Sequence, residues 1–244
     1  MTTDTPVTYE VRDQVAHITL NRPSRRNAIT GPLGVALAEA FEAAQDDGDV
    51  NAVLFSGAGG AFCSGLDLGE FSADPKPDWM AEWPALWRRA HKAIFACEKP
   101  IVGALERFAI NGGAALMLAC DFVVAGETAF LHVGEVQIGM AAPYNLAWLR
   151  LKHSEAVCMQ LAMLGERVEG TSLVTLGVAH TAVPDTAVRE HASALAAQLA
   201  GYPNRAAPRI KRGLRKTTDV DMDAYFDRAW SAASGGAKPP PKKS

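Results

Sequence analysis

Two segments of the sequence share one order of elements: a short apolar strand, a glycine-rich turn and a helix. The first spans residues 50–70 and the second spans residues 101–120. Serial repetition of such a unit is typical of a chain that stacks successive turns into a superhelix. The repeat therefore predicts an α/β fold made of β-β-α turns rather than a doubly wound sheet.

The second unit contains a candidate site. Residues 101–105 form an apolar run that predicts a buried strand, a turn follows at Asn111-Gly112-Gly113, and residues 114–120 have good helix propensity. Paired glycines let a backbone approach a ligand closely, and the first N–H groups of a helix have no acceptor inside it. Such a helix start can hold a phosphate or a reaction oxyanion, although an ordinary strand–turn–helix corner has the same pattern.

The rest of the chain divides at about residue 185. The earlier part predicts a hairpin at 7–11 and 16–20, a helix that starts at Thr30 and Pro32, and a helix with Trp83 and Trp87 on one side. From about residue 143 onward the sequence predicts only helices, in segments near 143–151, 154–164, 170–176, 186–200, 205–215 and 221–232. We therefore predict a core over residues 1–185, a helical lid or assembly region over 186–234 and a disordered tail over 235–244.

Composition and motifs exclude several classes of function. A net charge of −3 gives no general attraction to nucleic acid or to an anionic membrane, and the longest strongly apolar stretch, 114–120, is too short to span a bilayer. The N-terminus has no secretory pattern, and the four cysteines form no CxxC pair, which favours reduced core residues in a cytoplasmic protein. No histidine spacing indicates a metal site, so we expect no metal and no redox cofactor.

Phosphate-loop and hydrolase motifs also fit poorly. Phe62 stands where the G-x-G-x-x-G template needs a small residue, and no Gly-Lys-Ser/Thr is present. Ser64 does not lie in G-x-S-x-G.

Taken together, the motifs resemble those of the crotonase superfamily, also called enoyl-CoA hydratase/isomerase, over nearly the whole chain. The segments that carry this resemblance are 21–28, 60–68, 109–113, Cys120-Asp121 and 134–139. The resemblance implies a crotonase-like β-β-α superhelix with a C-terminal helical trimerisation region, assembled as a homotrimer or a dimer of trimers. It also implies an acyl-CoA thioester as the substrate, with CoA as part of that substrate.

The same resemblance implies an oxyanion hole. The family holds the thioester oxygen between two backbone N–H groups, which here belong to Leu66 and Gly112. Loss of one such donor typically costs about 3 kcal/mol of transition-state stabilisation. Arg25 and Arg26 are candidates for the CoA phosphates, although a solvated loop explains them equally well. The remaining candidates for substrate or CoA contact are Ala28, Ser64, Asp67, Leu68, Gly113, Pro143 and Tyr144.

The acid and base groups distinguish this sequence within the family. Hydratases use two glutamates; one matches Glu135, but the other falls at Ala115, whose methyl group cannot exchange a proton. A single carboxylate can still move the double bond of a 3-enoyl-CoA into conjugation if apolar surroundings raise its pKa. We expect Val133, Val136, Ile138 and Met140 to supply those surroundings, whereas a solvated strand end is the alternative for Glu135.

Two further details are similar to single-glutamate Δ3,Δ2-enoyl-CoA isomerases. These are residues 64–68 and the segment 139–144, in which Pro143-Tyr144 replaces a glycine pair of many hydratases. Asn111 replaces a usual glycine and either alters the turn or adds a polar group to the pocket. Asp67, Glu70 and His132 are weaker candidates for a second acid, since Asp67 can cap its own loop and His132 can be a packed strand residue.

Three functions follow as hypotheses. The first is isomerisation of 3-enoyl-CoA to 2-enoyl-CoA through Glu135. The second is hydration of 2-enoyl-CoA, with another residue or a positioned water in place of the missing glutamate. The third is a non-catalytic acyl-CoA-binding or assembly subunit, because a fold does not fix a reaction.

Overall fold

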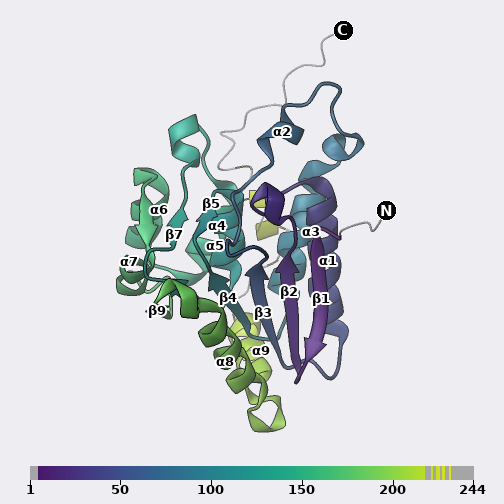
Figure 1. The fold of residues 1–244 in the computed structure, drawn as a ribbon, viewed down its shortest axis with the longest axis vertical. Coiled ribbons are helices and arrows are strands. Elements are labelled where there is room, and N and C mark those ends of the chain that lie inside the picture. Colours follow the sequence, from purple (N-terminus) through teal and green to yellow (C-terminus); the bar gives the residue numbers. More distant parts are fainter. Residues whose placement is uncertain (1–4, 218–220, 222–223, 226, 229–230, 232–244) are drawn as a thin grey trace.

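The computed structural model describes residues 5–217 together with residues 221, 224–225, 227–228 and 231. Two sheets and the helices around them form the molecule (Figure 1). The strands are β1 Val7–Arg12, β2 Val15–Leu20, β3 Ala52–Gly57, β4 Ile101–Leu105, β5 Phe108–Ile110, β6 Phe122–Gly126, β7 Phe130–His132, β8 Arg167–Glu169 and β9 Thr181–Val183.

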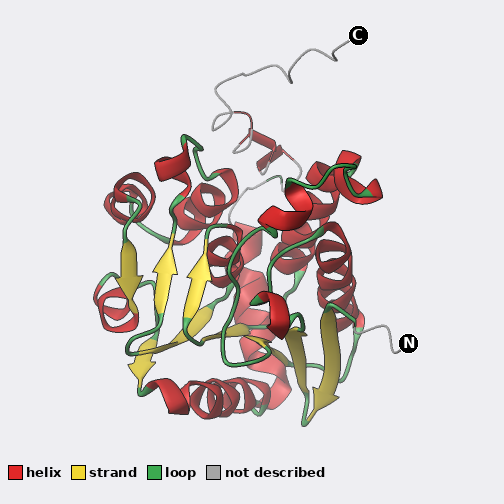
Figure 2. Ribbon diagram, turned by 45° about the horizontal axis from the view of Figure 1, so that its top comes forward, coloured by secondary structure: helices red, strands yellow, loops and turns green. Residues whose placement is uncertain are grey.

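The larger sheet has six strands in the order β1-β2-β3-β4-β6-β9. The β1–β2 pair is an antiparallel hairpin, and every later pair in this sheet is parallel. The smaller sheet has the order β5-β7-β8, with β5 parallel to β7. Figure 2 shows both sheets in yellow with helices packed around them.

The helices enclose these sheets. The α-helices are α1 Gly31–Asp46, α2 Leu68–Phe71, α3 Trp83–Ala96, α4 Gly112–Ala119, α5 Pro143–Lys152, α6 Glu155–Leu164, α7 Gly170–Thr175, α8 Val188–Ala200 and α9 Ala206–Thr217. The 3-10 helices are η1 Pro23–Arg25, η2 Asp78–Ala81, η3 Glu135–Ile138, η4 Asp185–Ala187 and η5 Pro203–Arg205.

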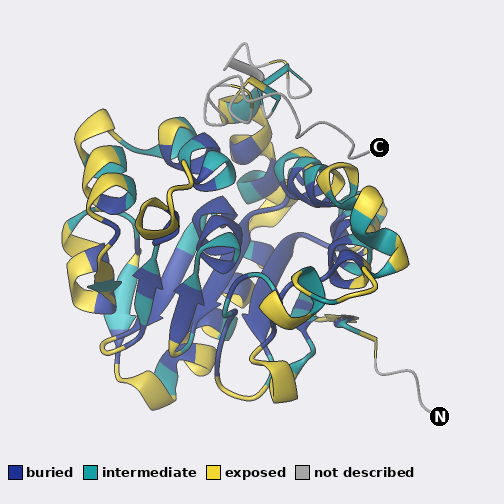
Figure 3. Ribbon diagram, turned by 90° about the horizontal axis from the view of Figure 1, so that it is seen from above, coloured by how far each residue is buried: buried dark blue, intermediate teal, exposed yellow. Residues whose placement is uncertain are grey.

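Each face of the larger sheet is covered by its own layer of helices. In β3, Val53 and Phe55 belong to the core shared with α1, α3 and α4, whereas Leu54 belongs to the core shared with α8. This division follows from the alternation of side chains along a strand. Figure 3 shows the central strands of the larger sheet in the dark blue of buried residues, and β3 and β4 are buried along their whole length.

The predicted superhelix is confirmed. Strand β4 leads through β5 into α4, and the next turn begins with β6 and β7. The preceding turn has the same course, because Cys63, which follows β3, pairs with Ala109 of β5 in a parallel bridge. The glycine turns therefore stack beside one another, which brings the segments 64–66 and 110–112 together.

The predictions of individual helices and strands are most accurate where the sequence pattern is long. Helix α1 is capped by Thr30, whose Oγ1 accepts from Leu33 N at 3.3 Å, and Leu37 and Phe41 on its inner face are fully buried. Three strands were missed. Strand β5 separates the predicted strand from the predicted turn of the second unit, and β8 and β9 interrupt the part predicted to be all helical.

The C-terminal part begins with a helix that belongs to the sheet's packing. Helix α8 contributes Val188, Ala192, Ala196 and Ala200 to the core under β3, β4 and β6. The helix predicted near 221–232 lies only partly within the described residues, and the predicted tail at 235–244 lies outside them.

Candidate active site

The first candidate donor is the N–H of Leu66. A parallel bridge joins Leu66 to Ile29, in which Ile29 N donates to Gly65 O at 2.8 Å and Asp67 N donates to Ile29 O at 2.9 Å. In such a bridge the peptide groups on either side of Leu66 face Ile29, so its own N–H points away. Within the described part of the chain no group accepts a hydrogen bond from Leu66 N.

The second candidate donor is the N–H of Gly112, the first residue of α4. Because the first N–H groups of a helix have no acceptor within it, this group remains available for a ligand. A Cβ built on Gly112 would lie 3.1 Å from Ile29 Cδ1 and 3.9 Å from Leu66 Cδ2. The two residues that carry the predicted donors therefore lie close together, next to the Ile29 side chain.

Glu135 starts the 3-10 helix η3 and is only 8% exposed. Its Oε1 accepts from Asn145 Nδ2 at 2.8 Å, and its buried Oε2 has no hydrogen-bond partner among the described residues. Burial raises the pKa of Glu135 to about 7, against smaller opposite effects of hydrogen bonds from its own backbone and from Asn145. A carboxyl group with such a pKa can exchange a proton at neutral pH.

Asn145 links this carboxylate to the residue that precedes Gly112. The same Nδ2 that donates to Glu135 also donates to the carbonyl of Asn111 at 3.2 Å. Asn111 immediately precedes Gly112, so one amide group separates the candidate base from the candidate oxyanion hole. The sequence analysis did not identify Asn145, and no motif marks it within the polar and apolar mixture of the 143–151 helix.

The surroundings of Glu135 differ from the prediction. Val133 is buried, but Val136, Ile138 and Met140 are 43%, 67% and 47% exposed. They lie after Glu135 along a 3-10 helix and the turn beyond it, which carries their side chains outward. The hydrogen-bonding partner of the carboxylate comes instead from α5.

The position of the missing second glutamate lies in the first turn of α4. Ala115 is fully buried there and contributes a methyl group. The other suggested acids have structural partners. Asp67 caps α2 and pairs with Arg22 at 3.1 Å and Arg25 at 3.0 Å, and Glu70 also pairs with Arg22.

His132 likewise has a structural contact, since its Nε2 lies 3.0 Å from Gly165 O. The ring therefore packs toward the start of β8, as expected for a strand residue rather than an acid.

The predicted substrate contacts form two groups. Arg25, Arg26 and Leu68 are exposed near the loop that bears Leu66, with the Arg25 guanidinium on Asp67, while Ala28 is buried and Ser64 is half-buried. The second group lies on the α4 and α5 side: Gly113 packs against Cys63, and Pro143 and Tyr144 begin α5. Tyr144 stacks on His91 with ring centroids 4.4 Å apart.

A cluster of aromatic side chains packs against the start of α4. Trp83 stacks on Trp87 with centroids 5.3 Å apart, and Trp87 packs edge-on against His91. A Cβ on Gly112 would lie 3.7 Å from Trp87 Cζ2. Trp87, predicted to lie with Trp83 on one side of its helix, therefore packs against the start of α4.

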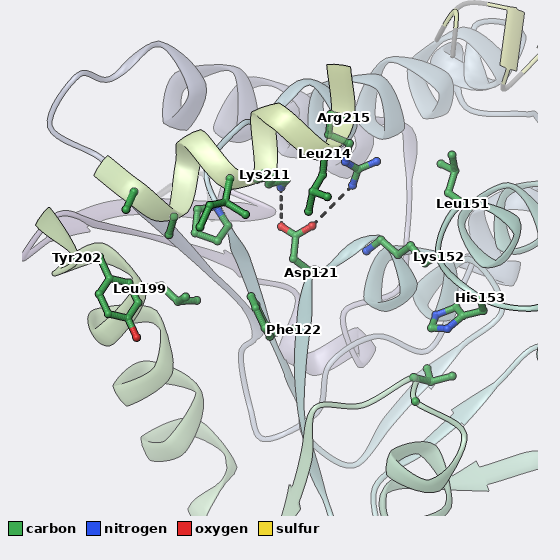
Figure 4. A pocket seen from close by; sticks show the side chains of 16 residues that line it. Asp121, Phe122, Leu151, Lys152, His153, Leu199, Tyr202, Lys211, Leu214 and Arg215 are labelled. Carbon is green, nitrogen blue, oxygen red and sulfur yellow. Dashed lines mark ion pairs between the residues drawn. The ribbon is translucent and has the colours of Figure 1, made fainter. Parts of the chain in front are cut away.

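A large cavity lies elsewhere in the molecule. It has a volume of about 870 Å³, lies between α9 and the start of β6, and contains none of the predicted site residues. Figure 4 shows Asp121 in this cavity between Lys211 and Arg215 of α9. Lys152 also lines it, with its pKa lowered to about 8 by burial, and donates to Ala119 O at the end of α4.

Two kinds of feature are absent from the described residues. These contain no cluster of three or more His, Cys, Asp or Glu side chains arranged for a metal ion. They also contain no helix with the length and apolar character needed to cross a bilayer.

Comparison with known proteins agrees with this geometry. The model of the enoyl-CoA hydratase/isomerase family matches residues 10–229. The 2,3-dehydroadipyl-CoA hydratase of Escherichia coli is 29% identical over 216 residues, covering 87% of this chain and 83% of that protein. The mitochondrial Δ(3,5)-Δ(2,4)-dienoyl-CoA isomerase of Rattus norvegicus is 29% identical over 226 residues, covering 87% and 69%.

A solved structure shows the same similarity. The crystal structure of an enoyl-CoA hydratase/isomerase from Mycobacterium paratuberculosis superposes with a TM-score of 0.84 at 29% identity, covering 96% of this chain and 94% of that one. The relatives therefore include both hydratases and isomerases.

Proposed function

The chain belongs to the enoyl-CoA hydratase/isomerase family, and on that premise we propose that it converts 3-enoyl-CoA to 2-enoyl-CoA with Glu135 as its single base. One observation carries the proposal. Glu135 is buried and linked through Asn145 to the residue before Gly112, its Oε2 has no hydrogen-bond partner among the described residues, and Ala115 supplies no second carboxyl group. Hydration needs a group that activates water and a group that protonates carbon, whereas a double-bond shift needs only one group, which removes a proton from one carbon and returns it to another.

The proposed reaction has two proton transfers. Ionised Glu135 removes a proton from C2 of the 3-enoyl thioester, and the electron pair of that C–H bond moves into the thioester, giving a dienolate. The N–H groups of Leu66 and Gly112 donate to the dienolate oxygen, which carries more negative charge than the ground-state carbonyl. Protonated Glu135 then returns the proton to C4, and the double bond lies between C2 and C3.

The remaining parts of the proposal concern binding and assembly. No metal or redox cofactor is needed, because the acyl chain is neither oxidised nor reduced. We propose that Arg25, Arg26 and Leu68 contact the CoA portion at the rim of the site. We also propose a homotrimer or a dimer of trimers that uses the C-terminal helical region, which light scattering of the purified protein can test.

A comparison of two substrates tests the reaction. We expect the protein to convert 3-enoyl-CoA to conjugated 2-enoyl-CoA, and Glu135→Gln to lower that rate by about 10³-fold. The matched control is Glu190→Gln, which changes an exposed carboxylate on α8 and should leave the rate unchanged. Fast formation of 3-hydroxyacyl-CoA from 2-enoyl-CoA, abolished by Glu135→Gln, would instead establish hydration. Binding of both esters without turnover would establish a non-catalytic acyl-CoA binder.

A further inference from the structure

Asn145 connects the two halves of the candidate site through a single amide group. Its side chain is 1% exposed, so its hydrogen bonds are made in surroundings where water does not compete. The two hydrogens of Nδ2 go to Glu135 Oε1 at 2.8 Å and to Asn111 O at 3.2 Å. These two bonds fix both the orientation of the amide and the distance between its two acceptors.

Asn111 makes the connection a second time. Its side-chain Oδ1 accepts from the backbone N–H of Gly134 at 2.9 Å, and its own N–H donates to His132 O at 2.7 Å. Asn111 precedes the oxyanion residue Gly112, and Gly134 precedes the base Glu135. The residue before the candidate oxyanion donor is thereby hydrogen-bonded to the residue before the candidate base.

Asn111 makes these hydrogen bonds in an unfavourable backbone conformation. Its φ of 50° and ψ of −113° lie in a region that side chains with a Cβ rarely adopt and that glycine tolerates. A residue retained in such a conformation requires support from its surroundings, and an observed outlier of this kind is grounds for a functional hypothesis. Here the support consists of the bonds from Gly134 and Asn145 and the bond to His132.

We propose that Asn111 and Asn145 form an asparagine bridge that positions the Glu135 carboxylate relative to the Gly112 N–H. This inference rests on the proposed function for the identity of the base, but the hydrogen bonds themselves do not depend on it. The bridge occupies Oε1 and leaves Oε2 as the oxygen that takes and returns the proton. Both asparagines are positioning residues, since they act through Glu135 and through Gly112.

The pKa of Glu135 should report whether the asparagine bridge is intact. A hydrogen bond donated to a carboxylate favours the ionised form, so loss of the Asn145 donor should raise the pKa of Glu135 further. No ionised side chain of the described residues contributes to that pKa. The nearby titratable groups are Tyr144, which stacks on His91, and His132, which bonds to Gly165 O, while α4 carries no titratable side chain.

Kinetics of two variants test the positioning role. Asn145→Ala should lower kcat for 3-enoyl-CoA by roughly 10- to 100-fold while KM changes less than about threefold, because misplacement of a catalytic group affects the chemical step. Asn111→Gly removes the side-chain bond to Gly134 yet suits the positive φ. It should therefore lower kcat without lowering the midpoint of urea unfolding, a separation that a merely structural residue would not give. In the double variant the losses should be less than additive.

Asn51→Ala is the matched control. Asn51 is also a buried asparagine with two hydrogen bonds from Nδ2, to Gln14 Oε1 and to Ala200 O, but these lie between the first hairpin and the end of α8. We expect this variant to lose stability while keeping the wild-type kcat of the folded protein.

A titration without substrate separates this inference from the proposed function. Carbon-13 NMR of protein labelled at glutamate carboxyls, assigned with Glu135→Gln, should give a Glu135 pKa that rises by about 1 in Asn145→Ala and is unchanged in Asn51→Ala. If the wild-type protein shows no isomerase activity, the proposed function fails while this titration still tests the bridge. An unchanged Glu135 pKa in Asn145→Ala would overturn the bridge, whatever the activity.

Discussion

Glu135 and Asp121 are both carboxylates in the interior of this chain, yet their surroundings differ. Glu135 Oε1 accepts from the neutral amide of Asn145, its Oε2 has no hydrogen-bond partner among the described residues, and burial raises its pKa to about 7. Asp121 accepts from Lys211 Nζ at 2.6 Å and from Ile101 N at 2.8 Å, and Arg215 lies 3.7 Å away. Burial acts to raise the pKa of Asp121 too, but the opposing attraction of Lys211 and Lys152 leaves it below its usual range.

The difference shows that burial alone does not indicate function. A carboxylate held by cations remains ionised and fastens α9 to the start of β6, which is a structural task. A carboxylate without an opposing charge is easily protonated, which suits a group that must accept and return a proton at neutral pH. The large cavity beside Asp121 therefore does not outweigh the chemistry at Glu135.

Of the substitutions that test this comparison, we expect Asp121→Asn to have the largest effect, a loss of stability. Asp121→Asn leaves Lys211, which is 7% exposed, next to a neutral amide, and we expect the free energy of unfolding at pH 7 to fall by about 3 kcal/mol. Urea unfolding gives this value. Glu10→Gln, which breaks an exposed pair with Arg12, is the control and should leave it nearly unchanged. Equal effects of the two substitutions would contradict the structural role of Asp121.

The two carboxylates should also respond to pH in opposite directions. Glu135 has a folded-state pKa above its unfolded value of 4.5, so the unfolded state loses its proton first as pH rises, and stability falls by up to about 3 kcal/mol between pH 4.5 and 7. Asp121, whose folded-state pKa lies below 3.8, contributes stability at neutral pH that is lost as pH falls through that pKa.

Unfolding measured across pH for the two variants separates these effects. Glu135→Gln should remove the decline above pH 4.5 and so stabilise the protein at pH 8, whereas Asp121→Asn should reduce the loss of stability in acid. Isomerase activity should rise with pH and reach a plateau above about pH 7, because the base must be ionised. A stability curve for Glu135→Gln parallel to that of the wild type would show that Glu135 titrates normally.

The smallest expected effects come from two glycines, one in each region. A Cβ on Gly113, beside the oxyanion residue, would lie 2.7 Å from Cys63 O, so Gly113→Ala should lower stability by about 1–3 kcal/mol. Gly213 lies on α9 between Lys211 and Arg215 with open space around it, and Gly213→Ala should raise stability by about 1 kcal/mol through helix propensity. Thermal unfolding of both variants measures the contrast, and a loss in Gly213→Ala would refute the open packing at α9.

The sequence predicted the superhelix because the strand, glycine turn and helix units recur, and α1 because its capping residue and inner face form a long pattern. Strands β5, β8 and β9 were missed because three residues are too few to establish an alternating pattern. Their pairing depends on neighbouring turns of the superhelix rather than on their own composition.

The candidate site was predictable to a similar extent. Leu66, Gly112 and Glu135 follow from motif resemblance, and the structure gathers them in one region. Asn145 could not be identified, because its contact with Glu135 arises only when α5 packs against α4. The exposure of Ile138 and Met140 was missed for a related reason, since a 3-10 helix there turns them outward.

Transfer of an isotope label tests the central role of Glu135 most directly. The substrate is 3-enoyl-CoA with deuterium at C2, and mass spectrometry and NMR locate the label in the product. If one buried carboxylate carries the proton between the two carbons, part of the deuterium should appear at C4 of 2-enoyl-CoA, and Glu135→Gln should abolish both the label transfer and the reaction. Product formed at the wild-type rate by Glu135→Gln, with solvent hydrogen at C4, would contradict the account.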